Sequence, residues 1–286
     1  MMRLYSLALA VALALLPLAA GADDTPQQIF SRLNQQKGEI QLGSNLAHLS
    51  LSQNFAYLNP ADSETFLTKL WGNPPGSGKD TLGMIIPTDG QNGPSWAIVI
   101  EYDDSGNVSD KDAGEIDYDQ LLKDMQQSTS DANEERRKQG YDTVELIGWA
   151  KPPYYDAQAK KLYWAKRLKF SDSADDTLNY DIRVLGRAGV LDLNVIGGID
   201  QLAMIDGRIN DILAMVAFNS GNTYAEFKPG VDKAAEYGIA GLIAGGILAK
   251  AGFFKFLIGF AKPIGLGVIA LAAGVGGFFK RMFRRA

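Results

Sequence analysis

The stretch that decides the fold is LYWAKRLKF at residues 162–170, LNYDIRV at 178–184 and LDLNV at 191–195. Apolar side chains occupy alternate positions in each run, which is the period of a β-strand with one face against a core. The connections between the runs are short, so neighbouring strands should run in opposite directions. The stretch therefore predicts an antiparallel meander, whose alternating apolar residues are Leu162, Trp164, Leu168, Phe170, Leu178, Tyr180, Ile182, Val184, Leu191, Leu193 and Val195.

Further strands and helices are expected on both sides of this meander. Residues 39–42 and 47–51 alternate as a hairpin, and strand-like runs follow at 81–86 and 96–102. Capping patterns start one helix at Thr25-Pro26-Gln27-Gln28, ending near Gly38, and another at Asn59-Pro60, ending at Gly72.

Two longer apolar stripes predict helices over residues 118–140 and 199–216, the second followed by a strand near 214–218. Residues 133–138 are fully polar and are expected to face water. The sum is an α+β domain, a mostly antiparallel sheet with helices packed on it, over residues 23–237.

The first 22 residues have the pattern of a secretory signal peptide. Arg3 precedes an apolar run at 4–18, and the small residues Ala20-Gly21-Ala22 stand before Asp23. We expect cleavage near Asp23. The alternative is an uncleaved N-terminal membrane helix, for which the apolar run is short.

The C-terminal residues 238–286 predict a membrane anchor. The apolar stretch 263–279, with 256–261 before it, can cross about 30 Å of hydrocarbon at about 1.5 Å per residue. We therefore expect one transmembrane helix, preceded by a Gly/Ala-rich interfacial segment at 238–249. A two-span hairpin is the alternative, and Gly241-x-x-x-Gly245 permits close helix contact and hence a homo-oligomer.

Charge sets the expected orientation. The basic tail Lys280-Arg281-Met282-Phe283-Arg284-Arg285 belongs on the cytoplasmic side by the positive-inside rule, which leaves residues 23–237 outside. We expect a single-pass protein of the bacterial inner membrane. Residues 23–237 hold 20 of the 28 cations and all 33 acids, a net charge of −13, which disfavours nucleic acid as a partner. The chain has no cysteine, so disulfides and thiolate chemistry are excluded.

Two loops resemble ligand-binding motifs. The Gly-rich residues 72–80 suggest a phosphate-binding loop, but the spacing is one residue too long and Asp80 replaces the Ser or Thr that would hold magnesium. Residues 101–112 place oxygen ligands and a glycine as in a calcium loop. This candidate calcium site comprises Asp103, Ser105, Asn107 and Asp112. The alternative for this segment is an acidic turn.

A catalytic residue set is not evident from the sequence. His48 is the only histidine and is expected on the exposed face of a strand, so a Ser-His-Asp triad or histidine metal site would have to include it. Carboxylate pairs such as Asp103-Asp104 and Asp175-Asp176 can serve as general acid and base, but most pairs among 33 acids are solvated.

Several motifs resemble a family of predicted bacterial membrane-anchored proteins, a domain of unknown function. They are Asn73-Pro74-Pro75, Leu82-Gly83-Met84-Ile85, Asn133-Glu134-Glu135-Arg136, Trp149-Ala150-Lys151-Pro152-Pro153-Tyr154-Tyr155-Asp156, Leu162-Tyr163-Trp164-Ala165, Leu178-Asn179-Tyr180, Leu185-Gly186-Arg187-Ala188-Gly189-Val190-Leu191 and Tyr237-Gly238. The resemblance implies membrane anchoring and no particular activity. The order of meander, helix and final strand is also similar to the Mog1/PsbP-type sandwich, whose members are largely binding and assembly factors.

The sequence therefore favours a membrane-anchored envelope protein that binds membrane lipid through its anchor and protein partners or an envelope component through its domain. The alternative is a hydrolase that uses carboxylates on an envelope component. A third hypothesis is calcium-dependent folding.

Overall fold

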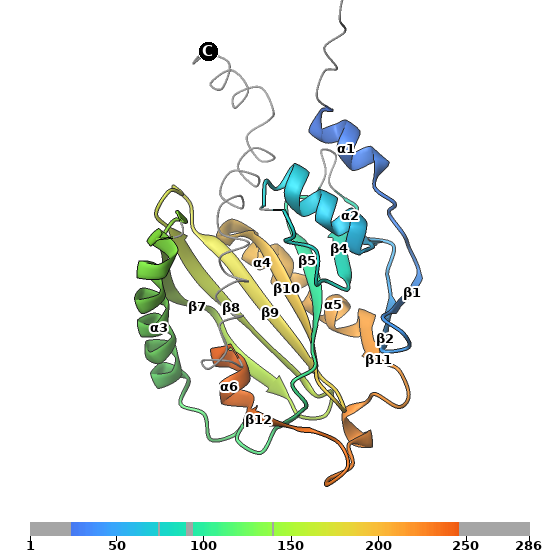
Figure 1. Cartoon of the computed structure of the whole chain (residues 1–286), viewed down its shortest axis with the longest axis vertical. Helices are drawn as coiled ribbons and strands as arrows, with labels where there is room; N and C mark the ends of the chain where they lie inside the picture. The colour runs from blue at the N-terminus through green and yellow to red at the C-terminus, as the bar shows by residue number, and fades with distance from the viewer. Residues whose placement is uncertain (1–23, 74, 90–93, 139, 246–286) are drawn as a thin grey trace, which may run out of the picture.

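A seven-stranded sheet forms the centre of the domain. The computed structural model describes residues 24–73, 75–89, 94–138 and 140–245. Strand order is β3-β4-β5-β10-β9-β8-β7, antiparallel throughout (Figure 1). The predicted meander is confirmed as β8, β9 and β10, and the α+β class is confirmed with it. The strands are β3 Phe55–Leu58, β4 Gly83–Pro87, β5 Ala97–Asp103, β7 Val144–Asp156, β8 Lys161–Phe170, β9 Thr177–Leu185 and β10 Val190–Gly198.

One face of this sheet, here called the α4 face, is covered by α4 (Leu202–Gly207) and α5 (Ile209–Met215). Ile212 and Met215 pack there with alternate residues of the meander such as Tyr180. The chain then forms β11 (Val216–Phe218), which joins the predicted hairpin of β1 (Glu39–Leu42) and β2 (Ala47–Ser50) in a separate three-stranded sheet. The expected final strand is thus confirmed.

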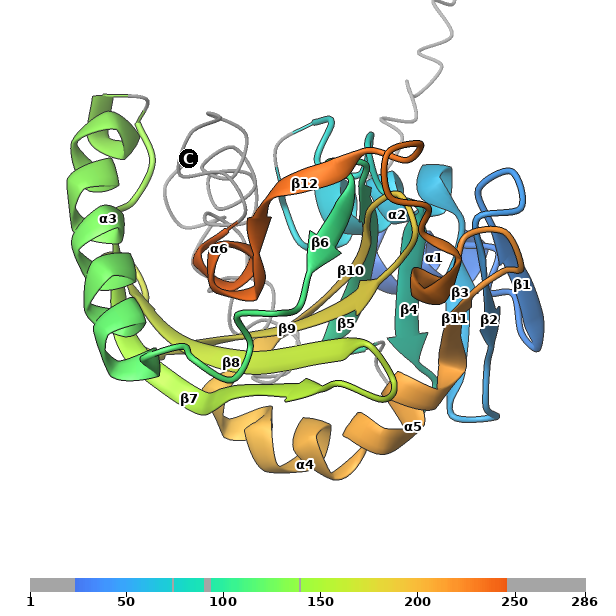
Figure 2. The ribbon, with the colours of Figure 1, turned by 90° about the horizontal axis from the view of Figure 1, so that it is seen from below.

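The opposite face, here called the α6 face, carries two separate hydrophobic cores. Figure 2 shows α6 on the other side of the sheet from α4 and α5. Over β7 and β8 lie α3 (Tyr118–Lys138) and α6 (Ile239–Ala244), next to the parallel pair β6 (Asn107–Ser109) and β12 (Ala234–Gly238). Over β3, β4 and β5 lie α1 (Pro26–Arg32) and α2 (Pro60–Thr65), which continues as the π-helix Phe66–Leu70.

The helix starts follow the predicted capping residues. Thr25 makes a capping box with Gln28, since its side chain accepts from the Gln28 amide and its own amide donates to Gln28 Oε1. Asn59 Oδ1 accepts from the Asp62 amide at 2.9 Å and caps α2. The first helix ends at Arg32, several residues before the expected stop at Gly38.

Four strands were not predicted, and each lacks a clear alternation. β7 contains register shifts between residues 146 and 148, 149 and 151, and 151 and 154, so its side chains do not keep a period of two. β3 is buried at every position. β6 and β12 are short and pair across 127 residues of sequence (Ala234 with Asn107).

The expectation that residues 133–138 face water is wrong at Arg136, which is 1% exposed. Its Nε donates to the Asp142 carbonyl at 2.7 Å, and its guanidinium lies 6.0 Å from the Phe170 ring. Asn133 also turns inward, bonding the backbone of Val144 through both amide atoms. These contacts fix the end of α3 on β7.

The expected signal peptide at 1–22 and the expected transmembrane helix at 256–279 lie outside the described residues. Among the residues the structure does describe, no helix combines the length and apolarity needed to cross a membrane. The described start of the expected interfacial segment is α6, whose Ile239, Leu242 and Ile243 are buried in the domain. The expected domain limit at residue 237 therefore falls inside a packed unit.

The two glycines of the expected helix-contact motif have local roles. A Cβ on Gly241 would lie 2.7 Å from the Cβ of Tyr237 in the same chain, so this glycine allows close packing within the domain. Gly245 has φ 107° and ends α6 in the left-handed conformation.

Candidate functional site

A band of polar side chains crosses the middle of the α6 face, between its two cores. Residues directly opposite on paired strands point to the same face. The register aligns Glu101 with Asp192 and Arg183, then Asn194 with Asp181 and Trp164, then Asn179 with Lys166. We call the polar members of this band the polar ladder: Glu101, Lys166, Asn179, Asp181, Arg183, Asp192 and Asn194.

Opposite charges in the polar ladder are paired. Asp181 contacts both cations, with Oδ2 2.9 Å from Lys166 Nζ and Oδ1 3.1 Å from Arg183 Nη2. Arg183 Nη1 also pairs with Asp192 Oδ1. The side chains of Lys166, Asp181 and Arg183 are 6%, 2% and 9% exposed, so removing one partner would leave a charge buried without compensation.

The indole of Trp164 borders these charges. Its ring lies 5.2 Å from the Arg183 guanidinium and 6.0 Å from Lys166 Nζ, within the range of a cation–π interaction. Its Nε1 and the Nδ2 of Asn194 are buried donors that find no acceptor among the residues the structure describes. Asn194 uses its oxygen to accept from Asn179 Nδ2 at 2.7 Å. An acceptor brought to these two donors would gain a hydrogen bond without further desolvation of the donors.

Glu101 can exchange a proton near neutral pH. Burial raises its pKa to about 7, a shift that Arg183 opposes and Asp80 adds to. Burial also lowers the pKa of the Arg183 guanidinium, although Asp181 and Glu101 favour its charged form. A carboxyl group that titrates near pH 7 beside a guanidinium suits proton transfer or a polar ligand.

A hydrogen-bonded corner joins the end of β5 to β12. Tyr237 Oη donates to Asp103 Oδ2 at 2.7 Å and lies 2.6 Å from Ser105 Oγ. The amide of Ser105 donates to Asp103 Oδ1 at 2.9 Å. Burial is the main cause that raises the pKa of Tyr237 to about 12. The phenol therefore stays protonated and holds the two strands together.

The four candidate calcium ligands are not brought to one point. Asp103 and Ser105 belong to the corner with Tyr237, while Asn107 Nδ2 donates to the Gly186 carbonyl at 3.0 Å. Asp112 accepts from the amides of Ile239 and Ala240 at 2.9 and 3.0 Å, at the start of α6.

No group of three or more His, Asp or Glu suited to a metal ion occurs among the described residues. Calcium at this loop stays a prediction. It would require Asp112 to leave α6, and it predicts a melting temperature that rises with calcium in the wild type and not in Asp103→Ala.

The Gly-rich loop directs its amides at a carboxylate of the protein itself. Glu64 on α2 accepts from the amide of Gly76 at 2.7 Å and from that of Gly78 at 2.6 Å. A Cβ on Gly78 would lie 2.7 Å from the Glu64 backbone, so the glycine permits this approach. These two amides already have an anionic partner.

The other residues considered for catalysis lie apart from the polar ladder. His48 lies on the outward face of β2, opposite the buried Ala47 and Leu49, as expected; it is half-buried there, and its Nδ1 lies 2.7 Å from Asn219 Oδ1. Asp176 pairs with Arg167 and Lys169 at the β8–β9 turn.

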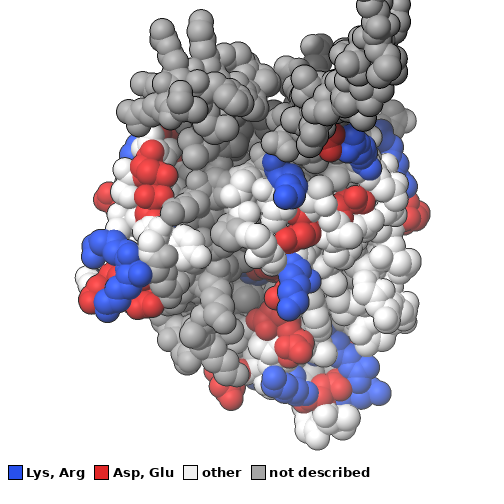
Figure 3. Space-filling view, turned by 45° about the horizontal axis from the view of Figure 1, so that its top comes forward, with Lys and Arg blue, Asp and Glu red and all other residues white. Residues whose placement is uncertain are grey.

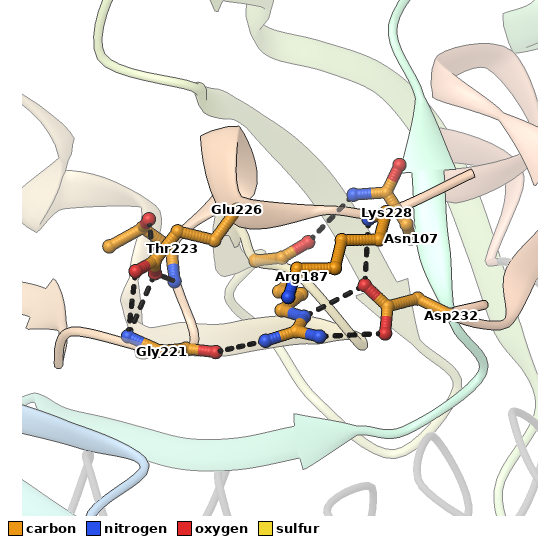
Figure 4. Close-up of polar contacts among 8 residues, drawn as sticks. Asn107, Arg187, Gly221, Thr223, Glu226, Lys228 and Asp232 are labelled. Atoms are coloured by element: carbon orange, nitrogen blue, oxygen red, sulfur yellow. Dashed lines mark hydrogen bonds and ion pairs between the residues drawn. The ribbon is translucent and has the colours of Figure 1, made fainter.

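The turn at 186–189 is tied to the loop that leads into β12 (Figure 4). Arg187 donates to both carboxylate oxygens of Asp232 at 2.8 and 2.9 Å and to the Gly221 carbonyl at 3.2 Å. The Asp232 carboxylate also accepts from the Lys228 amide, and the Arg187 bond is the main cause that lowers its pKa to about 2.

Neither glycine of this turn has room for a side chain. A Cβ on Gly186 would lie 2.5 Å from the Phe218 ring, and one on Gly189 would lie 2.0 Å from the Asp103 carbonyl. Both glycines stand in the hairpin turn between β9 and β10, where the Gly186 amide donates to the Gly189 carbonyl at 2.8 Å, and close packing excludes a side chain at either position. The polar ladder itself was missed, because Asn179, Asp181 and Arg183 have the spacing of a solvated strand face.

Comparison with solved structures gives weak likenesses, among them CyanoP and Mog1p. Cyanobacterial PsbP (CyanoP) from Synechocystis sp. PCC 6803 has a TM-score of 0.38 at 7% identity, covering 65% of this chain and 94% of that one. The Ran-binding protein Mog1p of Saccharomyces cerevisiae has a TM-score of 0.36 at 7% identity, covering 68% and 100%. No curated protein matches the sequence.

A protein-family model gives the firmer result. The model described as "Protein of unknown function (DUF2167)" matches residues 34–274, which include the polar ladder, the 186–189 turn and α6. The chain therefore belongs to the DUF2167 family.

Proposed function

We propose that this protein is a membrane-anchored binding or assembly module whose folded domain faces away from the cytoplasm. The observation that carries the proposal is α6. Asp112 caps it, and Ile239, Leu242 and Ile243 fix it in the domain core, about ten residues before the expected transmembrane segment 256–279. An anchor connected in this way would hold the domain at the membrane without a long linker.

Charge pairing favours binding over catalysis. The cations of the polar ladder are held by carboxylates, and on the face in Figure 3 Lys and Arg lie next to Asp and Glu. The mixed-charge surface in Figure 3 suits polar recognition of a protein or envelope component, while the net charge of −13 over residues 23–237 disfavours nucleic acid.

Orientation is testable because the chain has no cysteine. Val231 is 78% exposed, so Val231→Cys provides a single labelling site on the domain. Ala286→Cys provides one at the C-terminus. In bacterial spheroplasts, a membrane-impermeant maleimide is expected to label the first variant at once and the second only after permeabilisation. Labelling of both in intact spheroplasts would favour two spans, and protection of Val231→Cys would refute an external domain.

Partners are testable by crosslinking in cells, solubilisation and mass spectrometry. The control is a chain truncated after residue 245, which keeps α6 and so keeps the core intact. Membrane or envelope proteins recovered with the full chain and lost in the control are expected. Recovery of this chain alone, crosslinked to itself, would indicate a homo-oligomer, and recovery of nothing would count against an assembly role.

A carboxylate hydrolase acting on an envelope component is the second candidate. Glu101 and Asp103 lie on one face of β5, two residues and therefore about 7 Å apart along the strand, and the pKa of Glu101 is about 7. Glycoside hydrolysis uses two carboxyl groups on one surface, about 5 to 10 Å apart, and this is the pair that the proposal assigns to that role. Hydrolysis of cell-wall glycans that is lost in both Glu101→Gln and Asp103→Asn would support this candidate.

A further inference from the structure

Three tyrosines form a row on the α4 face of the sheet. The polar ladder lies on the opposite, α6 face. Tyr154 on β7, Tyr163 on β8 and Tyr180 on β9 have neighbouring ring centroids 5.3 and 6.5 Å apart. The inner ring, Tyr180, is fully buried, while Tyr154 is 55% exposed at the outer end. A large aromatic ring is thus presented to solvent on a support of two further rings.

Contacts from the neighbouring elements hold this row in place. Tyr180 Oη donates to Asp206 Oδ1 on α4 at 3.1 Å, and Lys151 forms an ion pair with the same carboxylate. Lys151 Nζ also lies 5.5 Å from the centroid of the Tyr163 ring. Pro152 and Pro153 precede Tyr154 and restrict the backbone there. A surface arranged in advance loses little conformational entropy on binding.

The surroundings of the exposed ring are amphipathic. The side chains of Lys151 and Asp206 are 30% and 38% exposed, so an ammonium and a carboxylate stand beside the aromatic row. Two other exposed apolar side chains, Ile147 and Met204, lie on β7 and α4, the elements that border the row. The surface therefore offers a ring face together with a hydrogen-bond donor and an acceptor.

We propose that this tyrosine row binds a pyranose ring of a glycan. A pyranose presents C–H groups on its face and hydroxyl groups at its edge. The C–H face complements the negative face of an aromatic ring, and the hydroxyls complement the Lys151 ammonium and the Asp206 carboxylate.

A protein partner fits this surface less well. A stable protein interface buries about 800 Å² on each partner and is depleted of charge at its centre. Here one exposed ring stands beside an ion pair. The proposal deepens the proposed function by naming an envelope component, and it rests on the proposed external location only for where such a glycan would be met.

Binding is tested by saturation-transfer NMR on the full-length protein in detergent, with two soluble probes: a β-1,4-linked N-acetylglucosamine tetramer and cellotetraose. Tyr154→Ala removes the ring, Tyr154→Phe keeps it, and Val231→Ala is a control at a distant exposed site. We expect transfer to the sugar C–H protons of at least one probe. Affinity should fall at least tenfold in Tyr154→Ala and stay within about twofold in the other two variants.

Two results would overturn the proposal: equal affinity in Tyr154→Ala, or no transfer from the wild type to either probe. Should Tyr154→Ala fail to fold, Tyr154→Lys replaces the ring by a solvated side chain and decides the same question. Maleimide labelling measures the location of the domain in cells, whereas saturation transfer measures sugar binding by the purified protein in detergent. The two results are independent, so failure of one proposal is distinguishable from failure of the other.

Discussion

Replacing Glu101 by glutamine tests the electrostatics of the polar ladder. Glutamine has the shape of the protonated carboxyl group and cannot ionise. Burial raises the pKa of Glu101 from 4.5 to about 7, so the folded protein holds this proton at a pH where the unfolded chain releases it. The wild type therefore loses stability from this group as pH rises from about 4.5 to about 7.

The size of the effect follows from the two pKa values. Their difference corresponds to at most about 3 kcal/mol of unfolding free energy. For a domain of this size, about 3 kcal/mol shifts the melting temperature by about 6 to 12 °C. The melting temperature of Glu101→Gln is expected to be close to that of the wild type at pH 5 and up to about 6 to 12 °C above it at pH 8.

Intrinsic tryptophan fluorescence of the full-length protein in detergent measures the transition, because Trp71, Trp96 and Trp164 are buried. Glu236→Gln, at an exposed position of β12, controls for the loss of one charge and is expected to change the melting temperature equally at both pH values. The reasoning is refuted if the melting temperatures of the wild type and of Glu101→Gln change by the same amount between pH 5 and pH 8.

Three further predictions concern packing, capping and acid stability. Gly189→Ala brings a methyl group to 2.0 Å from a backbone oxygen and should cost at least about 2 kcal/mol in thermal unfolding, whereas Gly207→Ala, with no atom within 4 Å, should cost nothing. Asp112→Ala removes the acceptor from two amides of α6 and should cost about 1 kcal/mol, seen as faster hydrogen exchange there; unchanged exchange would contradict the capping role. Because Arg187 lowers the pKa of Asp232 to about 2, its ion pair stabilises the loop above about pH 4 and is lost as pH falls toward about 2. Asp232→Asn should therefore speed proteolysis of this loop at pH 6 and have a much smaller effect at pH 2, where about half of the wild-type carboxylate is protonated, as measured with a neutral and an acid-active protease.

How far the fold follows from local pattern is clearest in the strands. β8, β9 and β10 were predictable because a half-buried strand alternates with a period of two, and the caps at Thr25 and Asn59 were predictable because a capping side chain bonds amides within three residues. β7 was not predicted because its bulges interrupt the alternation of side chains. β6 and β12 were not predicted because their pairing joins segments that are far apart in the chain.

The candidate site illustrates the same limit. Asn179, Asp181 and Arg183 occupy the alternate positions of a strand that ordinarily meet water, and the sequence contains nothing that distinguishes a solvated polar face from a buried one. The near-neutral pKa of Glu101 depends on burial and on Arg183, a residue of another strand. The motif glycines were visible, yet the atoms that exclude a side chain at Gly186 and Gly189 come from β11 and β5.

The sequence alone determined the features that depend on neighbours along the chain: the meander, the helix caps, the absence of cysteine and the uneven distribution of charge. Only the tertiary structure decided which charges meet, which carboxyl group is buried and which tyrosines stack. The physical reason is that hydrogen-bond caps and strand alternation act over a few residues, while pairing, burial and the pKa values that follow from them depend on residues brought together from distant strands.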